Sequence, residues 1–256
     1  MKKNRNLVRK RINKRFIPNI FTVMNMYLGF SAIILIISGD PLRGAWFVFA
    51  AAILDAFDGK LARMLGIEST FGTEFDSFAD TISFCVTSAL LIYTTWVNGL
   101  HPIIAISLSF VPIFFGTIRL AKFNLISDDE PKSYFTGLTT PLYALIMFGF
   151  ILFTNQQFGT NGDPRIALAL AITLGFGLIS QVKLGKIPYL SFKKGIKNSV
   201  RLSLSIMLFI SIVIWGGLIL FPALMLYVLW SVVNWIVQPD RFELTDKLAS
   251  SKMGIK

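Results

Sequence analysis

Long apolar runs constrain this chain more than any other feature. They follow one another along the sequence, separated by short polar or Gly- and Pro-containing breaks such as Gly39-Asp40-Pro41 and Asn98-Gly99. With 54% hydrophobic residues and a mean hydropathy of +0.65, the chain is too apolar for a soluble domain. A helix of about 20 apolar residues crosses a bilayer, and helices satisfy their own backbone hydrogen bonds there.

The sequence therefore predicts an all-α, polytopic helical membrane protein. We expect about eight transmembrane helices, at residues 16–37, 42–64, 75–97, 102–124, 138–154, 165–182, 201–220 and 222–237, with the last break at Phe221-Pro222. The predicted organisation is a basic segment at 1–16, a transmembrane domain at 17–237 and a tail at 238–256.

The positive charges indicate how these helices are oriented. If the N-terminus is cytoplasmic, alternation of eight spans places every Lys and Arg except Arg43 and Arg165 on the cytoplasmic side. The positive-inside rule predicts this bias, so we expect both termini in the cytoplasm. The net charge of +11 is spread between apolar runs. This distribution fits contact with anionic membrane lipids and argues against nucleic acid as a partner.

Four aspartates are concentrated between Leu54 and Asp80, where the sequence reads LDAFDGKLARMLGIESTFGTEFDSFAD. Asp55 and Asp58 are three residues apart, and Asp76 and Asp80 are four apart, so each pair projects from one face of a helix. Two such helices facing each other would bring four carboxylates together. These carboxylates repel in a low dielectric unless cations compensate them. Carboxylate oxygens suit Mg²⁺ or Mn²⁺, so the pattern predicts two ions that grip a diphosphate. The alternative is a solvated polar helix end.

Small and basic residues accompany the aspartates. Gly59 and Ala62 leave the helix surface open to a bulky ligand, and Arg63 offers a permanent cation to phosphate oxygen. The single cysteine, Cys85, and the single histidine, His101, provide no Cys- or His-based metal site.

The whole pattern, D-x2-D-G-x2-A-R-x8-G-x3-D-x3-D, is met at every fixed position, from Asp55 to Asp80 through Gly72. It resembles the signature of the CDP-alcohol phosphotransferases, integral membrane enzymes that transfer a phosphatidyl or similar group from a CDP-linked lipid to an alcohol. The resemblance implies that 17–237 is the catalytic domain and that the protein forms a homodimer. It also implies a metal cluster of Asp55, Asp58, Asp76 and Asp80, with Asp80 as general base, and contacts to the CDP-lipid from Gly59, Ala62, Arg63 and Gly72.

Polar residues recur at intervals of three in the first span. Asn19, Thr22 and Asn25 lie on one helical face near the membrane surface. They could cap the helix or hold it to a neighbour. Alternatively, Asn19 and Thr22 contact the CDP-lipid, because the family has a similar P-N-x-x-T segment near its nucleotide pocket.

Three further segments concern the acceptor alcohol: IRLAKFN at 118–124, YFTGLTTP at 134–141 and IPYLSFK at 187–193. Each alone is also typical of snorkelling cations and helix starts. Together they resemble segments of the bacterial and archaeal phosphatidylserine synthases within this family, except that Lys122 replaces an Arg and Thr139 a Pro. Arg119 and Lys122 are the candidates for binding the serine carboxylate or a phosphate.

The resemblance implies metal-dependent transfer of a phosphatidyl group from CDP-diacylglycerol to L-serine, which the charge distribution would place at the cytoplasmic face. Within the same chemistry, the acceptor could instead be glycerol phosphate or inositol phosphate. An ion or metal transporter is the alternative of another class, but the spans after Asp80 carry no Asp or Glu. An intramembrane prenyltransferase would carry two similar acidic motifs far apart, and this chain has one compact cluster.

Overall fold

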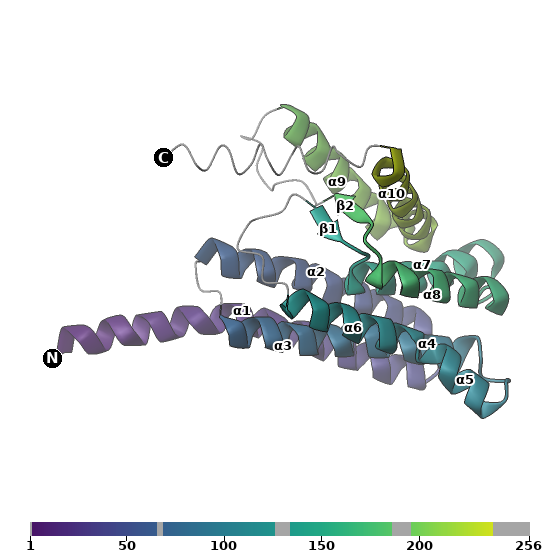
Figure 1. The fold of residues 1–256 in the computed structure, drawn as a ribbon, viewed down its shortest axis with the longest axis horizontal. Helices are drawn as coiled ribbons and strands as arrows, with labels where there is room; N and C mark the ends of the chain where they lie inside the picture. The colour runs from purple at the N-terminus through teal and green to yellow at the C-terminus, as the bar shows by residue number, and fades with distance from the viewer. Residues whose placement is uncertain (1, 66–68, 126–133, 186–195, 238–256) are drawn as a thin grey trace. The chain divides into compact units, whose positions relative to one another are not determined.

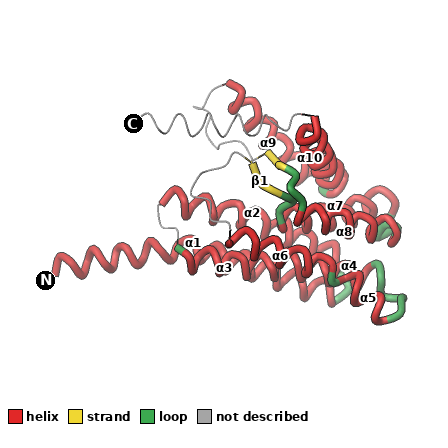
Figure 2. The backbone as a smooth tube through the Cα atoms, viewed as in Figure 1, coloured by secondary structure: helices red, strands yellow, loops and turns green. Residues whose placement is uncertain are grey.

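A computed structural model describes residues 2–65, 69–125, 134–185 and 196–237, and it is helical over nearly all of them (Figures 1 and 2). Within these ranges the side chains of 2–18, 58–65, 135, 196–202 and 204–206 are not described. The elements in chain order are α1 (Lys2–Ile37), α2 (Pro41–Leu65), α3 (Thr70–Asp80), the π-helix η1 (Thr81–Val86), α4 (Thr87–Thr95), α5 (Pro102–Ser109), α6 (Val111–Leu125), β1 (Tyr134–Thr136), α7 (Thr140–Phe158), α8 (Pro164–Ile179), β2 (Lys183–Gly185), α9 (Ile196–Trp215) and α10 (Gly217–Val237). The all-α class is confirmed, with one short β-ribbon added.

Four described helical stretches are long and apolar enough to cross a membrane: Asn19–Ile37, Thr70–Thr95, Pro102–Leu125 and Gly217–Val237. They correspond to four of the predicted spans, while the number of eight stays a prediction. Large apolar side chains such as Phe30, Phe78 and Leu226 are exposed on these stretches. Lipid can cover such side chains, as expected for an integral membrane protein.

The break predicted at Phe221-Pro222 is wrong. Helix α9 ends at Trp215, Gly216 takes a positive φ of 58°, and α10 begins at Gly217 and continues through Pro222. A side chain at Gly217 would collide with the α7 backbone at Leu152, so the glycine permits close helix packing. The Leu218 amide donates to Oε1 of Gln156 at 3.1 Å, which satisfies one of the first free N–H groups of α10.

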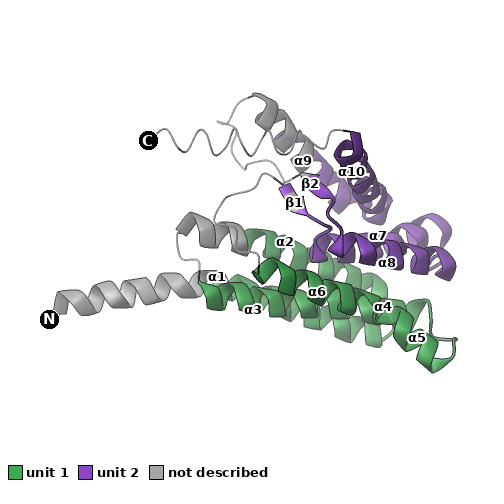
Figure 3. Ribbon diagram, viewed as in Figure 1, with its two compact units in different colours: residues 1–126 green, residues 127–256 purple. Residues whose placement is uncertain are grey.

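The chain divides into two compact units, residues 1–126 and 127–256 (Figure 3). In the first unit α1 packs along α2 and also contacts α3, η1 and α4, while α6 packs on η1. Small residues line the α1–α2 contact: Ala32, Gly44 and Ala45 are all buried. Such residues let helix backbones approach closely within a membrane.

The third predicted span is a single helical stretch composed of α3, η1 and α4, and it begins at Thr70 rather than at residue 75. Ser69 caps it, because its Oγ accepts a hydrogen bond from the Gly72 amide at 3.1 Å. The π-helical turn begins immediately after Asp80. Turns of this kind interrupt α-helices frequently at functional sites.

Most of the side chains of α7 in the second unit are buried, among them Tyr143, Met147 and Phe148. It packs against α8 and α10, and β1 pairs antiparallel with β2, Tyr134 opposite Gly185. Thr139, which stands where the resembling enzymes have Pro, is the N-cap of α7 and accepts a hydrogen bond from the Leu142 amide at 3.4 Å. The Thr139 hydroxyl therefore stabilises the first turn of α7.

Candidate active site

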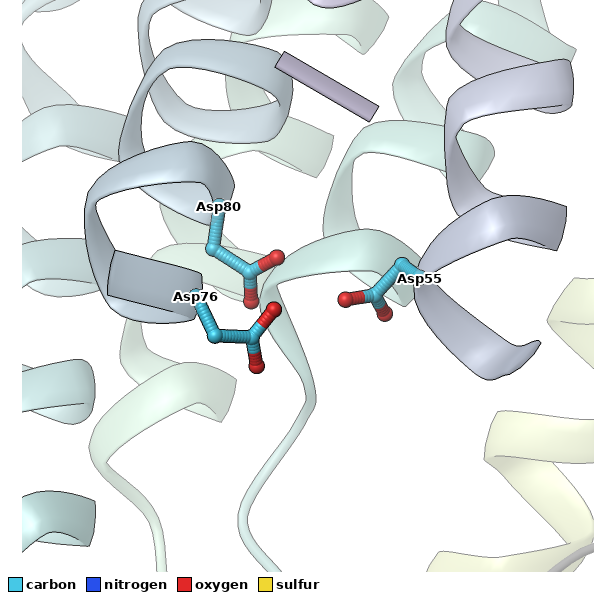
Figure 4. A group of neighbouring side chains, drawn as sticks. All are labelled: Asp55, Asp76 and Asp80. Carbon is cyan, nitrogen blue, oxygen red and sulfur yellow. The ribbon is translucent and has the colours of Figure 1, made fainter. Parts of the chain in front are cut away.

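Three of the four predicted metal ligands converge. Asp55 comes from α2, and Asp76 and Asp80 come from α3; one carboxylate oxygen of each lies within 4.8 Å of the others. Figure 4 shows the three carboxylates pointing into one space from the two facing helices. Asp76 and Asp80 share a face because they are one helical turn apart. The geometry predicted for this acidic cluster is confirmed for these three residues.

Burial makes the cluster electrostatically costly unless a cation is bound. Asp80 is 8% exposed, and Asp55 and Asp76 are half-buried. Three like charges this close cannot all remain ionised in a low dielectric without compensation. The donor set consists of carboxylate oxygens only, the ligands that Mg²⁺ and Mn²⁺ prefer. The residues therefore fit a hard divalent cation.

The remaining residues of the acidic motif on α2 cannot be placed in the same way. Asp58, Gly59, Ala62 and Arg63 belong to the helical range Pro41–Leu65, but their side chains lie outside the described residues. Their predicted roles stay predictions.

A basic side chain approaches the cluster from a third helix. Arg119, in α6, is half-buried and lies within electrostatic range of Asp80 and, more weakly, of Asp55. Its Nε is buried, and no group among the described residues accepts a hydrogen bond from it. Lys122, one turn later, is exposed in the last turn of α6. The structure therefore brings Arg119 to the site, whereas Lys122 faces outward.

Helix α1 forms another side of the site. A Cβ added to Gly72 would lie 3.9 Å from Oδ1 of Asn19, so α1 and the first turn of α3 are neighbours there. Thr22, one turn further along α1, is buried. The predicted contacts of Asn19, Thr22 and Gly72 with a CDP-lipid thus concern residues beside the acidic cluster.

Sequence reasoning did not connect several polar groups with the acidic cluster. Asn124 Nδ2 donates to Ser77 Oγ at 3.0 Å and ties α6 to α3 between the positions of Asp76 and Asp80. Asn25 and Ser83 are completely buried. The available signal was the series of Ser and Thr residues after Asp80 in an otherwise apolar span. Such residues commonly bond within their own helix, so the series did not by itself indicate a site.

Comparison with known proteins agrees with this geometry. The family model for CDP-alcohol phosphatidyltransferase matches residues 15–179, which is more than half of the chain and includes all the residues described above. The chain therefore belongs to the CDP-alcohol phosphatidyltransferase family of membrane enzymes.

Three curated relatives from different organisms carry the name CDP-diacylglycerol–serine O-phosphatidyltransferase. The relative from Helicobacter pylori is 31% identical over 221 residues, which cover 86% of this chain and 90% of the relative. The one from Methanocaldococcus jannaschii is 32% identical over 172 residues, 67% of this chain and 75% of the relative. The one from Bacillus subtilis is 29% identical over 179 residues, 70% of this chain and 92% of the relative.

Proposed function

We propose that this protein transfers a phosphatidyl group from CDP-diacylglycerol to the hydroxyl of L-serine, giving phosphatidylserine and CMP. The convergence of Asp55, Asp76 and Asp80 on one space carries the proposal. The name shared by relatives that match most of the chain supports serine as the acceptor.

The reaction forms one P–O bond and breaks another. Asp80 accepts the proton of the serine hydroxyl, and the oxygen attacks the phosphorus that carries the diacylglycerol. The bond from that phosphorus to the CMP oxygen breaks, and CMP leaves with the electron pair. Asp80 suits the role of base because it lies at the buried end of the cluster, where water competes least.

Asp55, Asp58, Asp76 and Asp80 would hold one or two divalent ions, Mg²⁺ or Mn²⁺. A bound ion supplies charge compensation for the diphosphate and for the leaving CMP. Arg119 carries a permanent positive charge beside Asp80 and would bind the serine carboxylate or a phosphate oxygen, with Lys122 as a weaker candidate.

The donor lipid would bind along residues of the first span and the remaining residues of the acidic motif. Asn19, Thr22 and Gly72 lie beside the cluster, and a Cβ at Gly72 would crowd Ser69 Oγ at 3.1 Å, so the glycine keeps α3 close to its neighbours there. Gly59, Ala62 and Arg63 would complete this contact from α2.

We further propose that the site faces the cytoplasm, with both termini on that side, and that two copies associate. In this scheme residues 1–16 and 238–256 flank a catalytic domain at 17–237. A cysteine introduced into 238–256 should react with an impermeant reagent in inverted vesicles and not in intact cells. Reaction in intact cells would contradict the orientation. Cross-linking of the protein in its native membrane should give a species of twice the subunit mass, and the absence of that species would contradict the dimer.

A transfer assay tests the reaction. The purified protein in detergent receives CDP-diacylglycerol, Mg²⁺ or Mn²⁺ and labelled L-serine. We expect labelled phosphatidylserine, no product when a chelator removes the metal, and recovery when metal is returned. Product with labelled glycerol phosphate or inositol phosphate, and none with serine, would overturn the choice of acceptor while leaving the reaction class intact.

A matched pair of variants tests whether the acidic motif is functional. Asp58→Asn should remove turnover, whereas Asp40→Asn should retain it. Asp40 lies outside the cluster and pairs with Arg43 at 3.1 Å on the surface, where an ion pair contributes little to stability. Full activity of a folded Asp58→Asn protein would show that the motif serves structure only.

A further inference from the structure

Asn25 is a buried polar side chain with unmet hydrogen-bonding capacity. It lies on α1 with 0% exposure, and neither Nδ2 nor Oδ1 has a hydrogen-bond partner in the described part of the chain. A buried carboxamide without partners destabilises a fold. A ligand that binds the Asn25 carboxamide would supply the missing hydrogen-bond partners.

The packing of α1 against α3 and η1 shows where this carboxamide lies. Asn19 is next to Gly72, the Asn25 carbonyl accepts a hydrogen bond from Ser83 Oγ at 3.1 Å, and Gly29 abuts Ser83. The two helical stretches therefore run side by side in the same direction.

Side chains of an α-helix lean toward its N-terminus. The Asn25 carboxamide thus leans from the level of Ser83 back toward the level of Asp80, one turn earlier. Asn25 is therefore buried beside η1, the turn that begins directly after the proposed base.

Exposure decreases steadily along this side of the site. Thr73 in the first turn of α3 is exposed, Asp76 is half-buried, Asp80 is 8% exposed and Ser83 is 0% exposed. The end next to Asn25 is therefore closed. A bulky nucleotide needs the open end, which leaves the end at Asp80 and Asn25 for a smaller group.

We propose that Asn25 binds the acceptor alcohol and helps determine which alcohol is used. The carboxamide can donate two hydrogen bonds and accept others, so it can bind an amino or carboxylate group of serine while Asp80 binds the hydroxyl. Because it is neutral, it adds no charge to the acidic cluster. This inference rests on the proposed transferase function.

Kinetics of the full-length protein in detergent test the proposal. Asn25→Ala and Asn25→Ser are compared with Ser88→Ala. Ser88 is the matched control: it is 0% exposed, its Oγ also lacks a partner among the described residues, and it lies eight residues beyond Asp80, about 12 Å along the helix. The KM for L-serine and the KM for CDP-diacylglycerol are measured separately, together with thermal unfolding.

Loss of one good hydrogen bond to the substrate should raise the KM for serine about tenfold in Asn25→Ala. The KM for CDP-diacylglycerol should stay within about twofold, and Ser88→Ala should change neither value. An unchanged KM for serine, or an equal rise for the lipid, would overturn the proposal. Failure of both Asn25 variants to fold would also overturn it, because Asn25 would then be a structural residue.

These outcomes are separable from failure of the proposed function. If the unaltered enzyme rejects serine and uses another alcohol, the same comparison is made with that alcohol. A rise in its KM confined to the Asn25 variants would support the inference about Asn25 and correct only the identity of the acceptor.

Discussion

The two compact units of the chain bury different kinds of side chain. Around α3 and η1, the first unit buries Asp80, Asn25 and Ser83. Around α7, the second unit buries mainly apolar and aromatic side chains, among them Met147 and Phe148. Both interiors are helical and both belong to a membrane protein, so the difference does not follow from the fold class.

The units also differ in how their buried polar groups are satisfied. In the second unit the Tyr143 hydroxyl donates to the Ala171 carbonyl at 3.2 Å, and the Thr154 hydroxyl donates to the Phe150 carbonyl at 3.0 Å. In the first unit the Asn25 carboxamide and the Arg119 Nε have no partner among the described residues. Each such group costs about 1–3 kcal/mol. The first unit therefore contains buried polar groups that lower stability, whereas the two hydroxyl groups named in the second unit are satisfied within the fold.

The largest expected difference between the units is in turnover, when one aspartate in each unit is replaced by asparagine. Asp80→Asn removes the proposed base and should lower turnover by at least about 100-fold. Its unfolding temperature should be unchanged or higher, because one repelling carboxylate is gone.

The control for that exchange is Asp163→Asn. Asp163 caps α8 by accepting a hydrogen bond from the Arg165 amide at 2.7 Å, and Asn caps helices equally well. Turnover and unfolding temperature should both match those of the unaltered protein. Substantial turnover in Asp80→Asn would remove the proposed role of this residue.

The second-largest difference, in both stability and turnover, is expected when one methyl group is added to a helix contact in each unit. In Gly29→Ala the new Cβ collides with both backbone and side chain of Ser83, whereas in Gly149→Ala it meets Leu220 at 3.4 Å, an ordinary contact. Gly29→Ala should cost about 1–3 kcal/mol. It should also reduce turnover, because it pushes α1 away from the turn that follows Asp80.

Gly149→Ala should change stability by less than about 1 kcal/mol, because the small gain from replacing a helical glycine offsets any crowding. Thermal unfolding and the transfer assay measure both variants. Equal behaviour of the two would show that the close approach of α1 to η1 is not needed for activity.

The smallest effect is expected in the second unit alone. Tyr143→Phe removes the hydroxyl that bonds the Ala171 carbonyl and should cost about 1 kcal/mol of stability. Turnover, measured below the unfolding temperature, should remain within about twofold. A large loss of turnover with little loss of stability would mean that the second unit contributes directly to the chemistry.

The sequence by itself determined the class of fold and the chemistry of the cluster. A bilayer admits few backbone arrangements, so long apolar runs were enough to predict a helical membrane protein. The spacing of Asp76 and Asp80 was enough to place them on one face, because a helix has a fixed period. Local caps such as Ser69 and Thr139 also depend on neighbouring residues only, although the span that Ser69 caps was predicted to begin later, at residue 75.

Only the tertiary structure decided what meets across helices. It placed Asp55 opposite Asp76 and Asp80, brought Arg119 near them, and buried Asn25 without a partner. It also started α10 at Gly217, where α7 approaches too closely for a side chain, although the local signal at Pro222 predicted a later start. Periodicity and turn residues report on the chain within about one helical turn. Contacts between helices depend on how distant segments pack, and no local pattern encodes that.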